Sequence, residues 1–175
     1  MKTIYFIGGT MGVGKTTLST ELLKKLDKSV MLDGDWCWFQ GNWNFCEENR
    51  KMVIDNIAYL LNNFLKNSNF ENIIFCWVMH QQSIINDILQ KLNYEYNFYN
   101  FSLIADENTI RERLKNRIGE NFNIDEFEKS VKNSMDRIKC YNEVDSIKID
   151  VSNIKFVKEN LKILIVKLIT LNIIL

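Results

Sequence analysis

A glycine-rich segment near the N-terminus has the residue types and the spacing suited to phosphate binding. It reads Gly9-Thr10-Met11-Gly12-Val13-Gly14-Lys15-Thr16-Thr17. Its first eight residues fit the pattern G-x-x-x-x-G-K-[ST], in which glycines let backbone N–H groups turn inward around an anion. Lys15 would reach the β- and γ-phosphates of a nucleotide, and the Thr16 hydroxyl would ligate the Mg²⁺ that bridges them. The segment therefore predicts that residues 9–17 bind a nucleoside triphosphate, with ATP as the default.

Two carboxylates follow the next apolar run, in the triplet Asp33-Gly34-Asp35. In an extended segment, residues two apart point the same way, so we expect both carboxylates to face the crevice at the carboxyl ends of the strands. One would hold Mg²⁺ and the other would accept the proton of an attacking hydroxyl, while Gly34 would let a substrate come near. The triplet alone is also typical of a polar turn. Its place at the end of the strand that follows the P-loop (Walker A) segment favours a site.

Arginines are concentrated in one part of the chain, whereas lysines are spread from end to end. Four of the five are Arg111, Arg113, Arg117 and Arg137. Guanidinium is suited to bidentate phosphate contact, and on a helix Arg113 and Arg117 would share a face. Arg111 would point elsewhere and form surface ion pairs. The partners expected for it are Glu107, Glu112 and Glu120.

The elements that must position these groups alternate between strand-length apolar runs and segments of helical period. The pattern predicts strands over residues 3–8, 29–33, 73–79, 98–104 and 146–151. It predicts helices over residues 15–26, 47–67, 83–92, 107–117, 124–141 and from 154 to about 171. Such alternation indicates an α/β fold with a five-stranded parallel sheet and helices on both faces. No linker composition divides the chain, so residues 1–175 are expected to form one domain.

Composition excludes several classes of partner. The 175 residues carry 22 Lys and Arg against 22 Asp and Glu, which argues against a protein that grips nucleic acid or an anionic membrane. Four cysteines without metal-site spacing are expected to be reduced thiols in a cytoplasmic protein. The apolar stretch 163–175 is shorter than the roughly 20 residues that cross a bilayer. We expect ATP and a small molecule as partners of a monomer or homodimer.

The P-loop segment followed by Asp33-Gly34-Asp35 resembles the small P-loop kinases, a group that includes shikimate kinase, gluconate kinase, chloramphenicol phosphotransferase and the nucleoside monophosphate kinases. The resemblance covers most of the chain. It implies a P-loop NTPase fold, a three-layer α/β/α sandwich with sheet order 2-3-1-4-5, and a small lid at about 117–137. The pattern Arg113-Leu114-x-x-Arg117 resembles the entry to that lid, and Arg137 followed by Tyr141 resembles the helix returning from it.

The resemblance also implies roles for individual residues. Asp33 would sit near the metal with Thr16, and Asp35 would contact and deprotonate the acceptor hydroxyl. Arg113 and Arg117 would lie on the nucleotide side, with Arg117 against the adenine or the phosphates. Arg137 would stabilise the transferring phosphoryl group. The segment 149–152 resembles the last strand, whose end passes the adenine, although a core strand with a polar cap fits it as well.

Two segments depart from the pattern or bear on the acceptor. The run 73–79 lacks the terminal Asp of a Walker B strand and is followed by His80, which would touch the substrate or the metal's water shell, or else be a hydrogen-bonded structural residue. A glycine-rich loop of the shikimate kinase kind is absent there, which disfavours shikimate. The segment 36–45 holds three of the four tryptophans, beginning with Trp36. This segment would either receive a planar or sugar-like acceptor or simply cover the sheet. Only Arg50 and Lys51 are basic residues close to it, which disfavours an acceptor that carries its own phosphate.

These features predict an ATP- and Mg²⁺-dependent phosphotransferase that moves the γ-phosphoryl group to a hydroxyl of a small molecule. Lys15, Asp35, Arg117 and Arg137 would act in catalysis. A nucleoside or nucleotide kinase is the alternative within the same chemistry. A P-loop ATPase that acts as a nucleotide-dependent switch, without a small-molecule acceptor, is the alternative from another class.

Overall fold

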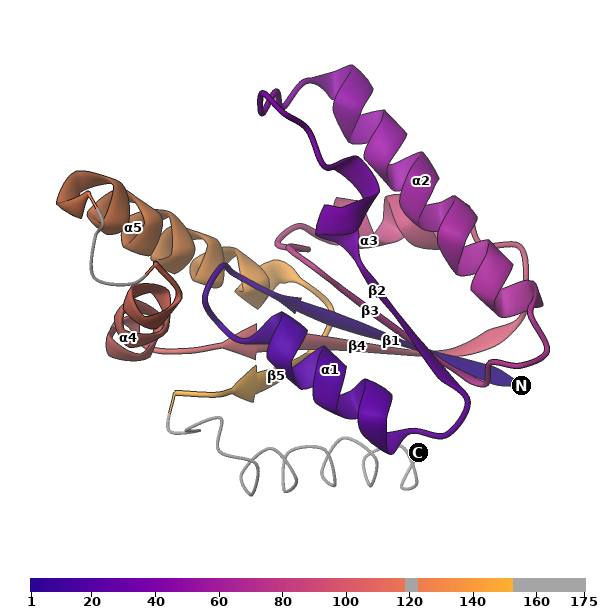
Figure 1. Ribbon diagram of the computed structural model, residues 1–175. Coiled ribbons are helices and arrows are strands. Elements are labelled where there is room, and N and C mark those ends of the chain that lie inside the picture. The colour runs from indigo at the N-terminus through magenta and orange to yellow at the C-terminus, as the bar shows by residue number, and fades with distance from the viewer. Residues whose placement is uncertain (119–122, 153–175) are drawn as a thin grey trace.

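The sheet is five-stranded and entirely parallel. A computed structural model of the chain describes residues 1–118 and 123–152 (Figure 1). The strands lie in the order β2-β3-β1-β4-β5. They are β1 (Lys2–Gly9), β2 (Ser29–Asp33), β3 (Asn72–Trp77), β4 (Tyr96–Ile104) and β5 (Ile147–Asp150). The order and the parallel pairing confirm the fold class expected from the alternation of strands and helices.

Five α-helices and two short 3-10 helices connect the strands in the described residues. They are α1 (Lys15–Lys25), α2 (Glu47–Lys66), α3 (Gln82–Leu89), α4 (Glu107–Ile118), α5 (Ile124–Cys140), η1 (Gly34–Trp38) and η2 (Tyr141–Glu143). Each expected helix up to residue 141 is present within a few residues of its predicted bounds. The helix expected from residue 154 lies outside the described residues.

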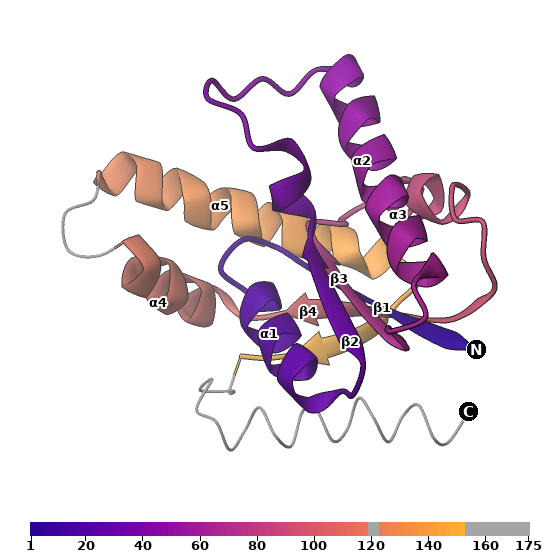
Figure 2. The same ribbon diagram turned by 45° about the vertical axis from the view of Figure 1, so that its right-hand side comes forward.

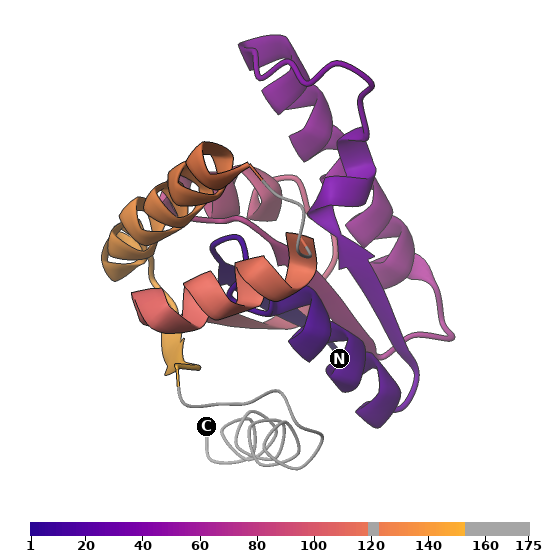
Figure 3. The ribbon, with the colours of Figure 1, turned by 60° about the vertical axis from the view of Figure 1, so that its left-hand side comes forward.

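Helices cover both faces of the sheet because the central strands are apolar on both faces. On β1, Tyr5 and Ile7 pack with the buried side of α1. Ile4 and Phe6, which point to the opposite face, pack with α2. Side chains of a strand alternate between faces, so a run without polar residues requires a cover on each side. Figure 2 shows the resulting layers, with α1 on one face and α2 and α3 on the other. Figure 3 shows α4 and α5 side by side.

The parallel register brings the ends of three strands together. Asp33 at the end of β2 pairs with Cys76 of β3, and Gly8 near the end of β1 pairs with Trp77 of β3. All strands run in the same direction, so the segments that leave β1, β2 and β3 emerge at one edge. This edge is where ligands bind in open α/β sheets.

The structure describes the four cysteines, whereas the apolar stretch 163–175 lies outside the described residues. All four cysteines are free thiols, and the most buried of them is Cys76 in β3. None of the helices within residues 1–118 and 123–152 has the length and apolar character needed to cross a membrane.

Candidate active site

The loop between β1 and α1 has a backbone shaped for an anion. Gly12 has φ 80° and Gly14 has φ 105°, both in the left-handed region that residues with a Cβ rarely adopt. Gly14 directly precedes α1 and offers no side-chain cap, and the first turn of α1 has no acidic residue. The N–H groups at this helix end therefore lack an acceptor from a capping side chain. A phosphate would supply one, at the positive end of the helix dipole.

Lys15 lies across the loop. Its Nζ donates a hydrogen bond to the Thr10 carbonyl oxygen over 3.0 Å. Burial lowers the pKa of Lys15, and the positive charge of Arg117 lowers it further, whereas Asp33 and Asp35 act in the opposite direction. A desolvated ammonium group is stabilised strongly by an anion, so this environment favours the binding of a phosphate at the loop.

Three side chains from the C-terminal half of the chain anchor the loop, and local sequence patterns did not reveal two of them. The backbone N–H of Gly9 donates to the Tyr141 hydroxyl over 2.9 Å, and the Ser134 hydroxyl donates to the Met11 carbonyl over 3.2 Å. Burial raises the pKa of Tyr141, so its hydroxyl stays protonated at neutral pH. The loop is thus held in shape by α5 and η2, more than a hundred residues away in the sequence.

Arg113 is the third anchor. It donates to the Val13 carbonyl over 2.7 Å and to the Val151 carbonyl over 2.9 Å, which ties the loop to the end of β5. Its half-buried guanidinium therefore has a structural task that the sequence did not indicate. A contact between Arg113 and a nucleotide remains a prediction.

Arg117 and Arg137 are exposed on α4 and α5 and lie within electrostatic range of the site. The charge of Arg117 acts on Lys15, and the charge of Arg137 acts on His80. The chain between α4 and α5, near the start of the expected lid, includes residues 119–122, which lie outside the described residues. The lid and the roles expected for these two arginines remain predictions.

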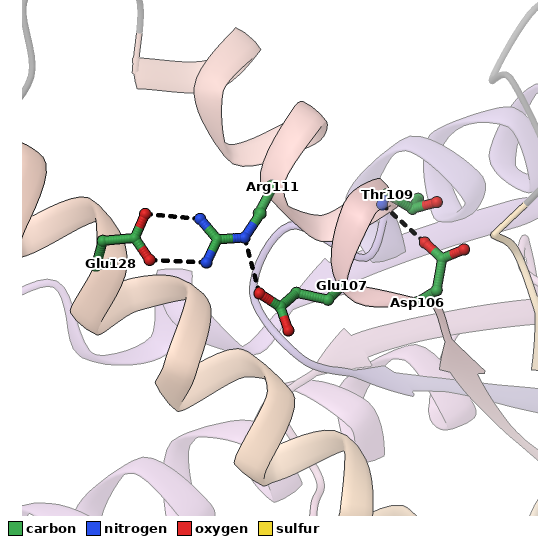
Figure 4. Close-up of polar contacts among 5 residues, drawn as sticks. All are labelled: Asp106, Glu107, Thr109, Arg111 and Glu128. Carbon is green, nitrogen blue, oxygen red and sulfur yellow. Dashed lines mark hydrogen bonds and ion pairs between the residues drawn. The ribbon is translucent and has the colours of Figure 1, made fainter.

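Arg111 points away from the loop and joins α4 to α5 (Figure 4). Its guanidinium pairs with Glu107 over 2.8 Å and forms a fork with Glu128 over 2.6 and 2.7 Å. Figure 4 also shows Asp106 accepting the N–H of Thr109 at the start of α4. The surface role expected for Arg111 is confirmed with Glu107, while Glu128 is a partner that the sequence did not indicate.

Thr16 and Asp33 form the pair that could hold a magnesium ion. The Thr16 hydroxyl donates to the Asp33 carboxylate over 3.1 Å, with Thr16 exposed and Asp33 buried. Mg²⁺ prefers oxygen ligands and commonly combines one or two protein groups with water and phosphate oxygens. No group of three His, Cys, Asp or Glu residues suited to a metal occurs in the described parts of the chain. The residues present therefore fit a Mg²⁺ held jointly with a nucleotide.

Asp35 reaches the same edge by a different geometry from the one expected. The strand ends at Asp33 and η1 begins at Gly34, so the extended arrangement predicted for this triplet is wrong. The side chain of Asp33 instead accepts the N–H of Asp35 over 3.1 Å, which caps η1. The indole N–H of Trp77 donates to the Asp35 carboxylate over 3.0 Å. The exposed Asp35 carboxylate is thereby fixed at one oxygen and open at the other.

Gly34 has a packing role and does not make room for a substrate. A Cβ at this position would lie 2.4 Å from Cγ of the Trp77 ring. The expectation that Gly34 lets a substrate come near is therefore corrected, because the space is filled by the indole that holds Asp35.

Replacing Gly34 with alanine should destabilise the protein, because the buried Trp77 ring must move. We expect the free energy of unfolding to fall by about 1–3 kcal/mol, the usual range for overpacking. Urea unfolding measures this, with Gly41→Ala as the matched control, since nothing lies within 4 Å of a Cβ added there. Equal stability of the two variants would contradict the packing role.

His80 follows β3 at the same edge of the sheet. It is half-buried, and its Nδ1 is buried without a hydrogen-bond partner in the described part of the chain. Burial lowers the pKa of His80, and the charge of Arg137 lowers it further. Both effects favour the neutral imidazole over the protonated one. Its contact with a substrate or with metal-bound water remains a prediction.

The lowered pKa of His80 makes folding sensitive to acid. The unfolded chain binds a proton at this residue at higher pH than the folded chain does, so stability should fall as the pH drops below about 6.5. His80 is the only histidine, which gives one imidazole signal in the NMR spectrum of a tag-free chain. We expect its titration midpoint below 6.5, and a midpoint at or above that value would refute the environment described.

The end of β5 is polar. Asp150 accepts a hydrogen bond from the Ser152 hydroxyl over 2.6 Å, and that hydroxyl accepts the N–H of Asp106 over 2.9 Å. The predicted strand is confirmed, and its polar cap is present. A contact with adenine remains a prediction.

The aromatic segment 36–45 divides into a covering residue and exposed residues. Trp38 is buried and packs against the core, which agrees with the alternative that the segment covers the sheet. Trp36 and Trp43 are each 63% exposed, beside the site. The segment therefore covers the sheet at one position and presents rings to solvent at others.

One protein-family model matches most of the chain. The AAA domain family matches residues 6–136, which include the loop, Asp33, Asp35 and the arginines of α4. Comparison with curated proteins finds no match.

Several solved structures share the fold at low sequence identity. A gluconokinase from Sinorhizobium meliloti has a TM-score of 0.65 at 15% identity, covering 97% of this chain and 96% of its own. Shikimate kinase from Bacteroides thetaiotaomicron has a TM-score of 0.65 at 16% identity, with 97% of each chain covered. The tunicamycin resistance protein of Deinococcus radiodurans has a TM-score of 0.59 at 18% identity, covering 86% of this chain and 87% of its own. The chain therefore belongs to the AAA domain family and has the fold of the small P-loop kinases.

Proposed function

We propose that the protein is a kinase that transfers the γ-phosphoryl group of Mg·ATP to a hydroxyl of a small molecule. The observation that carries the proposal is the placement of two carboxylates beside one phosphate-binding loop. Asp33 is bonded to Thr16 of the loop, and Asp35 is held with one carboxylate oxygen open. A carboxylate fixed in this manner could accept the proton of an acceptor hydroxyl or of an attacking water, and the kinases among the structures with this fold favour the hydroxyl.

The nucleotide side uses the loop and its neighbours. The backbone of residues 9–17 would surround the phosphates, with Arg113 and Arg117 adjacent, and Lys15 would neutralise charge that develops on the transferring group. Thr16 and Asp33 would hold Mg²⁺, the latter directly or through water. When bound, Mg²⁺ offsets negative charge on the phosphate oxygens.

The acceptor side is centred on Asp35. Its free carboxylate oxygen would orient the acceptor hydroxyl and accept its proton, while Trp77 holds the other oxygen. Trp36 and His80 would contact the acceptor, and Arg137 would approach the phosphoryl group as the lid closes. Positioning and charge neutralisation supply most of the rate enhancement in phosphoryl transfer, so these groups suffice for the reaction.

The relatives support a small hydroxylated acceptor. Gluconokinase and shikimate kinase are among the structures with this fold. Shikimate itself is disfavoured here, because β3 ends in Trp77 and continues into His80 without a glycine-rich loop. We further infer that the chain acts as one domain with its lid at about 117–137, in the cytoplasm, as a monomer or homodimer.

ATP consumption against a broad panel of hydroxylated metabolites, antibiotics and nucleosides tests the proposal. We expect at least one compound to accelerate consumption and to acquire a phosphoryl group. Acceleration by nucleosides alone would identify a nucleoside kinase. Steady hydrolysis that no compound changes would support a nucleotide-dependent switch and would overturn the proposal.

A further inference from the structure

We propose that the acceptor is an uncharged molecule with a flat ring next to its reactive hydroxyl, and that this ring binds on an aromatic wall formed by Trp36, Trp43 and Phe45. The inference rests on the proposed kinase function and names the substrate class of that same site. Trp36 lies in η1 directly after Asp35, and Trp43 and Phe45 lie in the segment that joins η1 to α2 (Figures 1 and 2).

The wall is unusual for a surface loop because its rings are large and open to solvent. Trp36 and Trp43 are each 63% exposed and Phe45 is 67% exposed. Trp43 and Phe45 both pack on the buried Trp38 ring, and Trp36 lies two residues before it in the sequence. Contiguous exposed apolar surface commonly marks a binding site, whereas single exposed residues need no explanation. Tryptophan and phenylalanine also offer flat faces on which another ring can stack.

Ring contacts connect the wall to the proposed catalytic carboxylate. Trp38 is the buried base of the wall, with ring centroids 4.4 Å from Trp43 and 5.9 Å from Phe45. The Trp38 ring also lies 6.0 Å from the ring of Trp77, whose indole N–H holds Asp35. The rings of Trp43 and Phe45 are thus connected through Trp38 and Trp77 to the residue proposed to receive the hydroxyl proton.

The loop that presents the rings is held by hydrogen bonds. The Asn49 side chain donates to the Asn44 carbonyl over 3.0 Å, and the Asn56 side chain donates to the Cys37 carbonyl over 2.9 Å. Both asparagines belong to α2, so the helix fixes the two ends of the loop. A surface that is already ordered loses little conformational entropy when a ligand binds, which favours a binding role.

Charge around the wall selects against an anionic acceptor. No lysine or arginine occurs in residues 36–46, while Asp33 and Asp35 stand at one end of the segment. Phe45 also lines a groove of about 810 Å³ between α2 and α3, whose lining includes Arg50, Lys51 and Lys91. There Arg50 pairs with Asp87 over 3.3 Å, and Lys91 pairs with Asp55 over 2.9 Å. An uncharged ring therefore fits the wall better than a phosphorylated or carboxylated one.

Matched sets of compounds test the substrate class. One set is methyl β-D-glucoside, phenyl β-D-glucoside and phenyl β-D-glucuronide, and another is ribose, uridine and uridine monophosphate. Binding to the full chain in the presence of a non-hydrolysable ATP analogue is followed by tryptophan fluorescence. We expect phenyl β-D-glucoside or uridine, the uncharged member of its set that carries a flat ring, to bind at least about tenfold more tightly than the other two members. A factor of this size corresponds to the loss of one good apolar contact.

The outcomes separate this inference from the kinase proposal. The inference would be overturned if a charged member bound most tightly, or if the flat ring gave no gain in affinity. The kinase proposal would still stand if any acceptor were phosphorylated. Absence of binding by every compound would also overturn the inference. A retained affinity for a fluorescent ATP analogue would then show that the nucleotide site itself is intact.

Variants locate the ring. Trp36→Ala and Trp43→Ala should each weaken binding of the preferred compound by about tenfold, with ATP binding unchanged. Tyr59→Ala is the matched control, because Tyr59 is an aromatic residue on α2 that is 70% exposed and lies outside the wall. Equal effects of all three variants would contradict the location. A dimer in sedimentation velocity that Trp43→Glu converts to a monomer would instead assign the wall to contact between two copies, and would overturn the inference.

Discussion

Replacing Asp35 with asparagine is expected to leave ATP binding unchanged and to slow phosphoryl transfer by about 100- to 10,000-fold, the range of a general base. Asparagine has nearly the same shape, and its carbonyl oxygen can still accept the Trp77 indole N–H. The variant therefore removes the proton acceptor and keeps the position of the side chain. Affinity for a fluorescent ATP analogue and single-turnover transfer to an identified acceptor measure the two effects separately.

The control for this variant is Asp87→Asn. Asp87 is a carboxylate on α3 that pairs with Arg50 and lies outside the proposed catalytic groups. It carries the same change of charge, so it reports any general electrostatic effect. If transfer by the Asp35 variant matched transfer by the Asp87 variant, Asp35 would have no role as the base.

Replacing Lys15 with alanine should weaken both nucleotide binding and turnover. The ammonium group lies across the loop on the Thr10 carbonyl and is desolvated, so an anionic phosphate would stabilise it more than water does. Loss of one such stabilising group typically costs about 100- to 1,000-fold in turnover. We expect the rise in melting temperature caused by Mg·ATP to disappear as well, because that rise depends on affinity for the folded state.

Lys24→Ala is the matched control for the Lys15 variant. Lys24 lies on the same helix and forms an exposed ion pair with Glu21, so its loss removes a positive charge without touching the loop. Thermal stabilisation by Mg·ATP should persist in this variant. Calorimetry that detects no loss of ATP affinity in Lys15→Ala would count against the site.

Much of the fold follows from local pattern. The apolar run at β3 and the alternating helices specify a buried parallel sheet, because a strand that is apolar on both faces must be covered on both. The glycines before Lys15 indicate the loop, since their backbone conformation is rarely available to other residues. Periodicity also places α2 almost to the residue, because its apolar positions recur over five turns.

The contacts that complete the site join residues distant in the sequence, and local pattern carries no signal for them. Tyr141 supports Gly9 across 132 positions, and Arg113 supports Val13 across 100. Gly34, where β2 gives way to a 3-10 helix, packs closely against the Trp77 ring, which comes from another strand. The sequence therefore indicates Asp35 as a candidate, whereas the contacts of its side chain became visible only in the structure.

The most direct test of the central claim follows the γ-phosphoryl group itself. The chain is incubated with γ-labelled ATP, Mg²⁺ and the compound that most accelerates ATP consumption, and the products are separated and identified by mass. We expect the label on a hydroxyl of that compound, at a rate that falls in the Asp35→Asn variant. Label found only in inorganic phosphate, at a rate that no compound changes, would contradict a kinase function.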